Sequence, residues 1–199
     1  MKPTKPAQEI TKLEVKSRKE LRRWLQKNHA QSRGCWVITF KKHVGKWQTT
    51  AEEVGEEALC FGWVDSKVGK VDADRSMLLI TPRKPNSRWS RTNKQRIAKL
   101  EQAGLLEPAG AAMVALAKSS GTWSALDAVE DLVLPPDLKA RFKLEAKVAL
   151  QNFDAFPRSV KRGILEWILT AKKPQTRADR IEQTVTMAAR NERANQWRP

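Results

Sequence analysis

The chain has 199 residues, enough for one large domain or two small ones with a real hydrophobic core. Its 38 Lys and Arg against 22 Asp and Glu give a formal net charge of +16, which favours polyanionic partners but says nothing of the fold. With two histidines and two cysteines, and no CxxC spacing, the usual zinc-binding patterns are excluded. We therefore expect no metal site and no cofactor.

The ends of the chain are polar. The first residues lack the apolar segment of a secretory signal, and no stretch approaches the roughly 18 apolar residues of a membrane span. We therefore expect a cytoplasmic protein without a membrane span. Residues 1–8 and 191–199 are expected to be loose tails.

The first part of the chain alternates between strand and helix patterns. Two capping-box spacings, Ser17 with Glu20 and Thr50 with Glu53, each predict the start of a helix, and Gly62 is well placed to end the second one. Apolar and β-branched runs predict strands at 10–15, 35–40, 63–68 and 75–81. The order β-α-β-α-β-β predicts an α+β fold for residues 9–120, with a mixed or antiparallel sheet and helices on one face. A basic helix at 90–103 follows.

The remainder of the chain has helical periodicity. The run Leu-Pro-Pro-Asp at 134–137 is a strong breaker, and we place a boundary near residues 120–135. Beyond it, apolar spacing predicts one helix from Leu138 to Phe153, a second after Ser159 and a third opening at Thr176. Residues 121–190 are thus expected to form an all-helical C-terminal subdomain.

Basic residues crowd the stretch 81–94, which joins the strand at 75–81 to the basic helix. No acidic residue occurs between Arg75 and Leu100, and Ser87 or Ser90 can cap the helix. Cations at a helix start are unfavourable because the macrodipole is already positive there, so a bound anion would relieve the strain. A solvated basic loop with incidental arginines is the alternative. The candidate anion-binding residues are Arg83, Arg88, Trp89, Ser90, Arg91, Asn93 and Lys94, together with Asp65.

Two of these residues have more than one interpretation. Trp89 suits stacking on a nucleic-acid base, and it equally suits an indole that fills the joint between sheet and helix beneath arginine stems. Asp65 lies inside a predicted strand, where it could pair with Arg83 or Arg88 and orient them. No helix-turn-helix, zinc-finger or RNP motif is present.

Cys60 is the candidate nucleophile, with Asp65 nearby. A reactive thiolate needs a positive neighbour or a base, and neither histidine has a sequence reason to lie close. Cysteine is also among the residue types most often buried. We therefore assign no catalytic residue.

Several short motifs together resemble the bacterial YdeI/OmpD-associated family, which is named for bacteriocin protection. The matching segments are EALCFGWVDS at 57–66, TPRK at 81–84, SRWSRTN at 87–93, GLLEPAG at 104–110, AKSSGTW at 117–123 and AKKPQTR at 171–177. The resemblance extends over about residues 10–185 and implies an α+β N-terminal part with a helical C-terminal part. It also implies a role in resistance to antimicrobial peptides or envelope stress, and association with an outer-membrane porin. Such a partner requires export, for which the N-terminus shows no signal, so we do not expect it here.

The leading hypothesis is a non-catalytic stress or peptide-resistance accessory protein with an anion-binding basic surface. A second hypothesis is non-specific nucleic-acid binding by the whole positive surface. A third is an enzyme acting on a small phosphorylated or carboxylated substrate beside Cys60 and Asp65, with Arg83 or Arg88 holding the anion.

Overall fold

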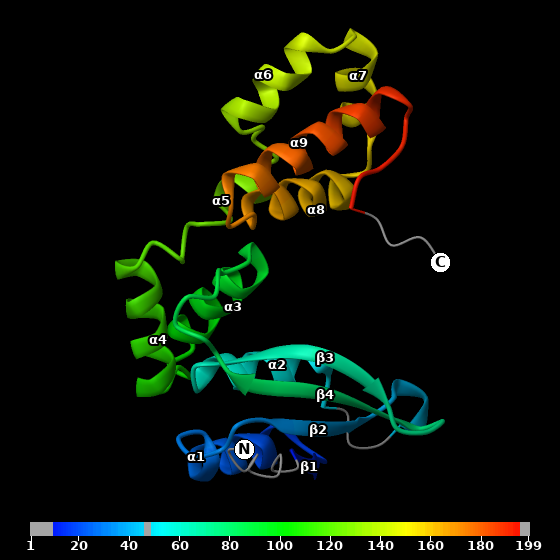
Figure 1. Cartoon of the computed structure of the whole chain (residues 1–199). Coiled ribbons are helices and arrows are strands. Elements are labelled where there is room, and N and C mark those ends of the chain that lie inside the picture. Colours follow the sequence, from blue (N-terminus) through cyan, green and yellow to red (C-terminus); the bar gives the residue numbers. More distant parts are fainter. Residues whose placement is uncertain (1–9, 46–48, 196–199) are drawn as a thin grey trace, which may run out of the picture. The chain divides into compact units, whose positions relative to one another are not determined.

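The computed structural model describes residues 10–45 and 49–195, and the chain divides into two compact units, 1–124 and 125–199 (Figure 1). The expected tail at 1–8 lies outside the described residues, as do the last four residues of the expected tail at 191–199. Each unit is described by itself.

The N-terminal unit contains a four-stranded mixed sheet in the order β1-β2-β4-β3. The β1–β2 pair is parallel, and the pairs of β4 with β2 and β3 are antiparallel. The predicted α+β class is therefore confirmed. The elements are β1 (Thr11–Glu14), α1 (Arg18–Asn28), β2 (Cys35–Phe40), a short 3-10 helix (Lys42–Val44), α2 (Ala51–Cys60), β3 (Trp63–Lys70), β4 (Arg75–Pro82), α3 (Arg91–Gln102) and α4 (Pro108–Ser119).

Local capping explains where the first two helices start and stop. Ser17 Oγ accepts a hydrogen bond from the Glu20 N–H, although Glu20 Oε2 accepts from the Lys16 N–H and not from Ser17 as the predicted box requires. At Thr50 the reciprocal box with Glu53 is complete. Gly62, with φ of +72°, follows α2 in the left-handed conformation that favours glycine.

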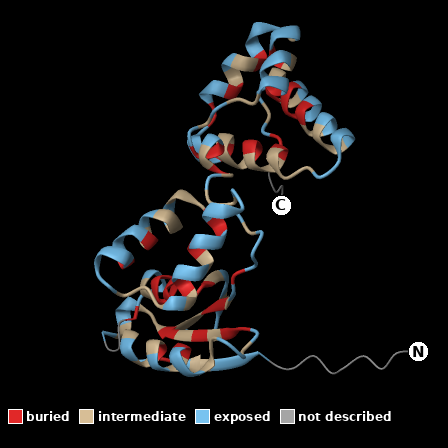
Figure 2. Cartoon of the chain, turned by 90° about the vertical axis from the view of Figure 1, so that its left-hand side faces the viewer, coloured by how far each residue is buried: buried red, intermediate tan, exposed pale blue. Residues whose placement is uncertain are grey.

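The core of the N-terminal unit lies between one face of the sheet and the helices. Strand β2 alternates buried and half-buried residues, so Cys35 and Val37 point toward the helices. These side chains pack with Ile80 of β4 and with apolar residues of α1, α2, α3 and α4 in one hydrophobic cluster. Figure 2 shows buried positions concentrated where the elements of each unit face one another.

The C-terminal unit consists of helices α5 (Asp127–Glu130), α6 (Pro136–Leu144), α7 (Lys147–Ala155), α8 (Arg158–Leu169) and α9 (Pro174–Ala189). They enclose a separate hydrophobic cluster, in which the rings of Phe142 and Phe153 lie 5.3 Å apart. The predicted all-helical C-terminal part is confirmed. Within residues 10–45 and 49–195, no helix is long and apolar enough to cross a bilayer.

Two details of the C-terminal prediction are wrong. The expected single helix from Leu138 to Phe153 is two helices, because the chain turns extended at Glu145, with φ −98° and ψ 166°. The break lets both phenylalanines reach the same core from different helices. Thr176 does not cap α9, which begins at Pro174 after Lys173, because proline favours the first helical position.

Candidate functional site

The site predicted at 81–94 is built on a stack between Arg83 and Trp89. Arg83 follows β4 directly, and its guanidinium carbon lies 3.8 Å from the centroid of the Trp89 ring. Arg83 Nη2 also donates a 2.5 Å hydrogen bond to the Arg88 carbonyl oxygen. Trp89 is itself 2% exposed and packs on Trp123, with 5.0 Å between ring centroids. The base-stacking interpretation of Trp89 is therefore wrong, because its indole belongs to the core and supports Arg83.

The start of α3 lies beside this stack. Ser90 is the N-cap, and its hydroxyl accepts from the Asn93 N–H at 3.3 Å. No acidic residue occupies the first turn. Asn93 Oδ1 accepts from Arg96 Nη1 at 3.3 Å, so the Asn93 side chain holds an arginine one helical turn further on.

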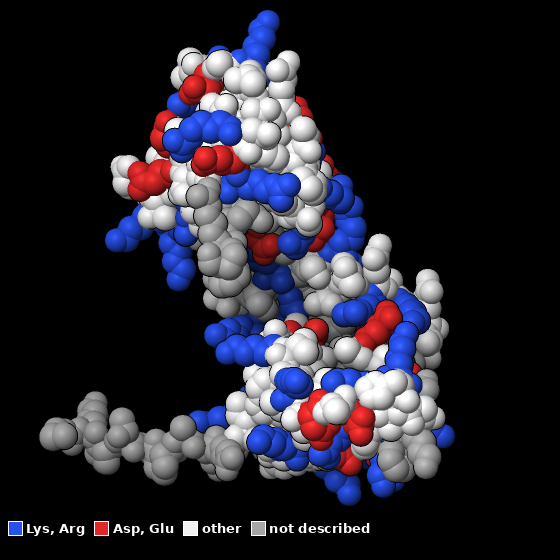
Figure 3. Space-filling model, turned by 90° about the vertical axis from the view of Figure 1, so that its right-hand side faces the viewer, with Lys and Arg blue, Asp and Glu red and all other residues white. Residues whose placement is uncertain are grey.

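The other basic residues predicted for the site fall into different surroundings. Lys94, half-buried on α3, has its ammonium 5.8 Å from the Trp123 ring centroid, and Lys118 approaches the same ring to 5.3 Å. Arg91 is also half-buried on α3. Arg88 is exposed, and its side chain has no partner within the described part of the chain. Figure 3 shows Lys and Arg side chains distributed over the visible face of each unit, with acidic side chains in smaller groups.

Asp65 approaches the site from β3, across the surface of α2. A Cβ atom placed on Gly55 would lie 3.7 Å from Asp65 Oδ1 and 3.4 Å from Arg96 Nη1, so both groups share the small space that this glycine leaves. Within the described residues Asp65 forms no ion pair with Arg83 or Arg88, and the expected direct pairing is not observed. Its carboxylate still acts on Arg83 over a longer distance.

Arg83 is the least satisfied charge of this group. Its residue is 5% exposed, and its Nε has no hydrogen-bond partner in the described structure. Burial lowers the pKa of Arg83 to about 10, and the Asp65 carboxylate opposes that shift incompletely. The Nε of Arg96 is likewise buried and without a partner. Two guanidinium groups near Asp65 therefore retain unused donors.

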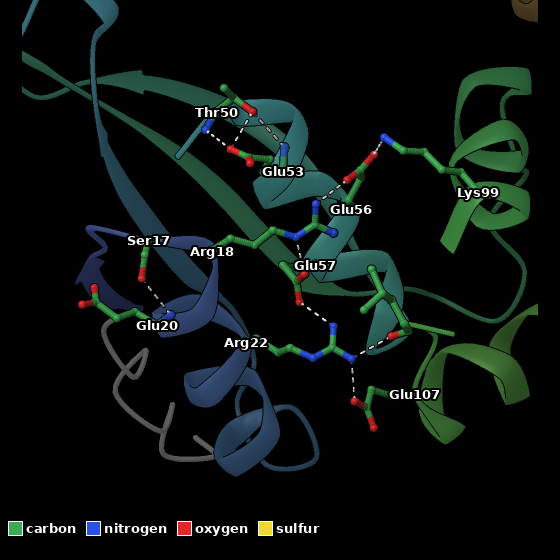
Figure 4. A network of polar contacts seen from close by, with 11 residues as sticks. Ser17, Arg18, Glu20, Arg22, Thr50, Glu53, Glu56, Glu57, Lys99 and Glu107 are labelled. Atoms are coloured by element: carbon green, nitrogen blue, oxygen red, sulfur yellow. Dashed lines mark hydrogen bonds and ion pairs between the residues drawn. The ribbon is translucent and has the colours of Figure 1, made fainter. Parts of the chain in front are cut away.

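A second charge cluster, which sequence reasoning missed, joins α1, α2 and α3 (Figure 4). Its centre is a pair of consecutive buried glutamates, Glu56 and Glu57, at 2% and 1% exposure. Arg18 contacts both carboxylates at 2.8 and 2.6 Å, and Lys99 reaches Glu56 at 2.9 Å. Two adjacent glutamates inside the otherwise apolar segment 54–60 were the signal that could have revealed it.

Arg22 extends this network toward α4. It contacts Glu57 at 2.9 Å and Glu107 at 2.7 Å, and it donates to the Leu105 carbonyl oxygen. Three cations thus meet three carboxylates. Burial alone would raise the pKa of Glu56. The cations of Lys99 and Arg18 outweigh this effect and hold the pKa of Glu56 below its ordinary value. The network is balanced in charge, which identifies it as a structural clamp between helices, in contrast to the unbalanced guanidinium of Arg83.

Cys60 ends α2 next to this clamp and is fully buried. Burial and the neighbouring Glu57 carboxylate raise the pKa of its thiol to about 11, although the Arg22 guanidinium works in the opposite direction. A thiol with so high a pKa stays protonated near neutral pH and is a poor nucleophile. Cys60 therefore gives the enzyme hypothesis no support.

Two family models match parts of the chain. Residues 13–113 match a family described as a domain of unknown function (DUF8412), and residues 131–191 match the family described as bacteriocin-protection, YdeI or OmpD-associated. No curated protein and no solved structure matches the chain. The chain therefore belongs to the first of these families, and residues 131–191 of its C-terminal unit are similar to the bacteriocin-protection, YdeI or OmpD-associated family.

Proposed function

We propose that this chain is a non-catalytic accessory protein in stress or antimicrobial-peptide resistance, and that it binds anionic groups at the basic surface around Arg83. The ligand we propose is a phosphate or carboxylate group held by Arg83 and Arg88 near the capped start of α3. The family description of the C-terminal domain supports the protective role. The geometry of the N-terminal unit supports the anion site.

The observation that carries the proposal is the unmet charge of Arg83. A buried charge is normally paired and fully hydrogen-bonded, because its removal from water is otherwise costly. The arginines around Glu57 follow this rule in their ion pairing, with carboxylates at 2.6 and 2.9 Å, although the Nη2 of Arg18 is buried without a hydrogen-bond partner in the described structure. Arg83 does not follow it in the described structure: its Nε has no partner, and no carboxylate lies within 4.0 Å. An anion at this place would supply the missing partner.

A purely structural role for Arg83 is the competing explanation. Its Nη2 bond to the Arg88 carbonyl oxygen and its stack on Trp89 both order the 83–90 loop. Such a role needs a planar cation or a long stem at this position, but it makes no use of the exposed Arg88 side chain. The two explanations therefore differ in what the removal of Arg88 does.

Calorimetric titration with inorganic phosphate and with polyphosphate tests the proposal. Arg88→Ala should weaken binding by about ten- to a hundredfold, because one charge-assisted hydrogen bond contributes about 1.5–3 kcal/mol. Lys27→Ala is the matched control: it removes one exposed cation from the end of α1, far along the chain, and should change the affinity less than twofold.

The salt dependence separates a discrete site from diffuse attraction. A discrete site keeps most of its affinity as salt rises, whereas diffuse polyanion attraction falls with a slope of about −0.9 per phosphate contacted on duplex DNA. Equal weakening by Arg88→Ala and Lys27→Ala, together with a steep salt slope, would refute the anion site.

A further inference from the structure

The sheet of the N-terminal unit has a second face, which points away from its hydrophobic core. Along β2 the half-buried residues Trp36 and Ile38 alternate with the buried ones, and along β4 Met77 and Leu79 are their direct neighbours in the ladder. None of these four side chains belongs to either hydrophobic cluster of the described residues; Trp36, Ile38 and Met77 are half-buried, and Leu79 is 9% exposed. We call this surface the outer sheet face.

One row of residues crosses all four strands on the outer sheet face. Strand pairing places Lys12 opposite Trp36, Trp36 opposite Leu79, and Leu79 opposite Lys67. Paired residues project to the same side of a sheet. The row is thus lysine, indole, leucine, lysine, with its two ends roughly 14 Å apart at a strand spacing of about 4.8 Å.

An irregularity in β3 brings the second lysine into this row. Strict alternation from Asp65, which faces the helices, would turn Lys67 to the same inner side. The register instead shifts between Asp65 and Lys67, so that Lys67 pairs with Leu79 of the outer face. Bulges of this kind occur at sheet edges, where they protect the edge strand, and beside functional sites, where they re-aim a side chain.

The charge of the outer sheet face is positive. Lys12 and Lys67 are exposed and form no ion pair within the ranges that the structure describes. The acidic residue of this face, Glu14, contacts Arg75 at 2.6 Å and is neutralised by it. The free charges beside Trp36 are therefore cations.

We infer that the row Lys12–Trp36–Leu79–Lys67 is a binding site for single-stranded nucleic acid. A base stacks on the accessible part of the half-buried indole of Trp36, with Leu79 as its apolar neighbour, and the lysines at both edges meet the phosphates on either side. Aromatic platforms flanked by cations bind single strands with little sequence preference, because every base has a π-face. Duplex DNA keeps its bases stacked and cannot use the indole.

The other possible occupants of this face fit less well. A second copy of the chain would bring Lys12 and Lys67 against the same lysines across a symmetric interface, which like-charge repulsion opposes. An anionic membrane would attract the two lysines, but its lipids have no planar rings that could stack on the Trp36 indole. Single-stranded nucleic acid supplies both the charge and the planar apolar groups.

Fluorescence anisotropy with a labelled oligothymidylate of about 12 nucleotides, and with a duplex of equal length, tests the inference. Trp36→Ala should weaken single-strand binding about tenfold and leave duplex binding within about twofold, because stacking is lost only where bases are exposed. Trp36→Phe keeps an aromatic ring and should retain most of the affinity, which guards against a folding defect in the alanine variant.

The contribution of Lys12 and Lys67 to binding is tested by comparing two double variants that remove the same number of positive charges. Lys12→Gln/Lys67→Gln should reduce the salt slope of single-strand binding by about 0.7 for each phosphate that a lysine no longer neutralises. Lys19→Gln/Lys27→Gln removes the same charge from exposed positions of α1 and should reduce the affinity less.

Three results would overturn the inference. The first is an unchanged single-strand affinity in Trp36→Ala. The second is an equal loss for single strand and duplex, which leaves only diffuse charge. The third is a dimer, or binding to anionic vesicles, that Trp36→Ala abolishes while oligonucleotide affinity stays the same. Arg88→Ala should not change the effect of Trp36→Ala on single-strand affinity. The single-strand site and the anion site at Arg83 are therefore tested by separate measurements.

Discussion

The guanidinium of Arg83 lies over the indole of Trp89 at 3.8 Å, yet no carboxylate of the described residues comes within 4.0 Å of it. Arg18 and Arg22, by contrast, each meet two carboxylates. The arginines of the N-terminal unit therefore differ in their pairing: Arg18 and Arg22 have carboxylate partners, and Arg83 has none among the described residues. The difference separates a charge-balanced network between helices from a buried guanidinium that has no ion-pair partner among the described residues.

Replacement of Arg83 by methionine should separate stability from binding. Arg83→Met keeps an unbranched apolar stem over Trp89 and removes a buried charge without an ion-pair partner. The free energy of unfolding should stay unchanged or rise by about 1–2 kcal/mol, since replacing a poorly compensated buried charge by an apolar side chain is often stabilising. Urea denaturation measures this change, and phosphate titration of the same variant should show no binding. A loss of more than about 2 kcal/mol would instead assign Arg83 to the structure alone.

Acid should weaken the clamp through Glu56. The pKa of Glu56 is lower in the folded chain than its ordinary 4.5 because Lys99 and Arg18 overcome the effect of burial. The ionised group therefore stabilises the fold above pH 4.5, and this contribution is lost as the pH falls through the lowered pKa.

Glu56→Gln should reduce the free energy of unfolding at neutral pH by about 3 kcal/mol, because it leaves the cations of the clamp underpaired. Urea denaturation at neutral pH and at about pH 3 should show the difference from the unmodified chain shrinking in acid. Glu101→Gln, at an exposed position of α3, is the control and should have little effect at either pH. A pH-independent loss in Glu56→Gln would assign its effect to packing and not to charge.

Both cysteines should resist thiol reagents in the native protein. Burial raises the pKa of Cys35 to about 12, and burial with Glu57 raises that of Cys60 to about 11. Both thiols therefore stay protonated in the fold, whereas an unfolded thiol ionises near 9.0, so stability should fall as the pH rises from about 9 to 11.

Labelling at about pH 8 should thus proceed at the rate of unfolding, and the urea-unfolded chain should react at once. Rapid labelling of native Cys60 would contradict its inert role and would restore the enzyme hypothesis.

Two glycines offer a matched test of packing. A Cβ on Gly110 of α4 would lie 2.3 Å from the Cys60 carbonyl oxygen, whereas a Cβ on Gly163 of α8 meets nothing within 4 Å. Gly110→Ala should therefore reduce the free energy of unfolding by about 2–3 kcal/mol, since neighbouring backbone must move. Gly163→Ala should raise it by about 0.5–1 kcal/mol, because alanine is the better helix former. Thermal and urea unfolding measure both changes, and a neutral Gly110→Ala would contradict the close approach of α4 to the end of α2.

Much of the architecture could be predicted because its signals are local. The caps at Ser17 and Thr50, the glycine stop at Gly62 and the apolar strands depend on neighbours within a few residues. The break between α6 and α7 has no such signal: no Pro or Gly marks Glu145, and the positions of Phe142 and Phe153 in one core decide it. Helical spacing alone could not distinguish one helix from two.

The sequence identified the residues of the candidate site, but it did not predict the contacts that their side chains make. The sequence by itself determined the acid-free basic run before and within α3, and the order of its strand and helix patterns determined the α+β class. The tertiary structure decided that Trp89 is buried beneath Arg83, that Glu56 and Glu57 are clamped by Arg18, and that the β3 irregularity turns Lys67 to the outer sheet face. These outcomes depend on contacts between residues far apart in the chain. Burial and the pairing of charges set the free energy of such contacts, and the periodicity of the sequence does not indicate which residues will meet.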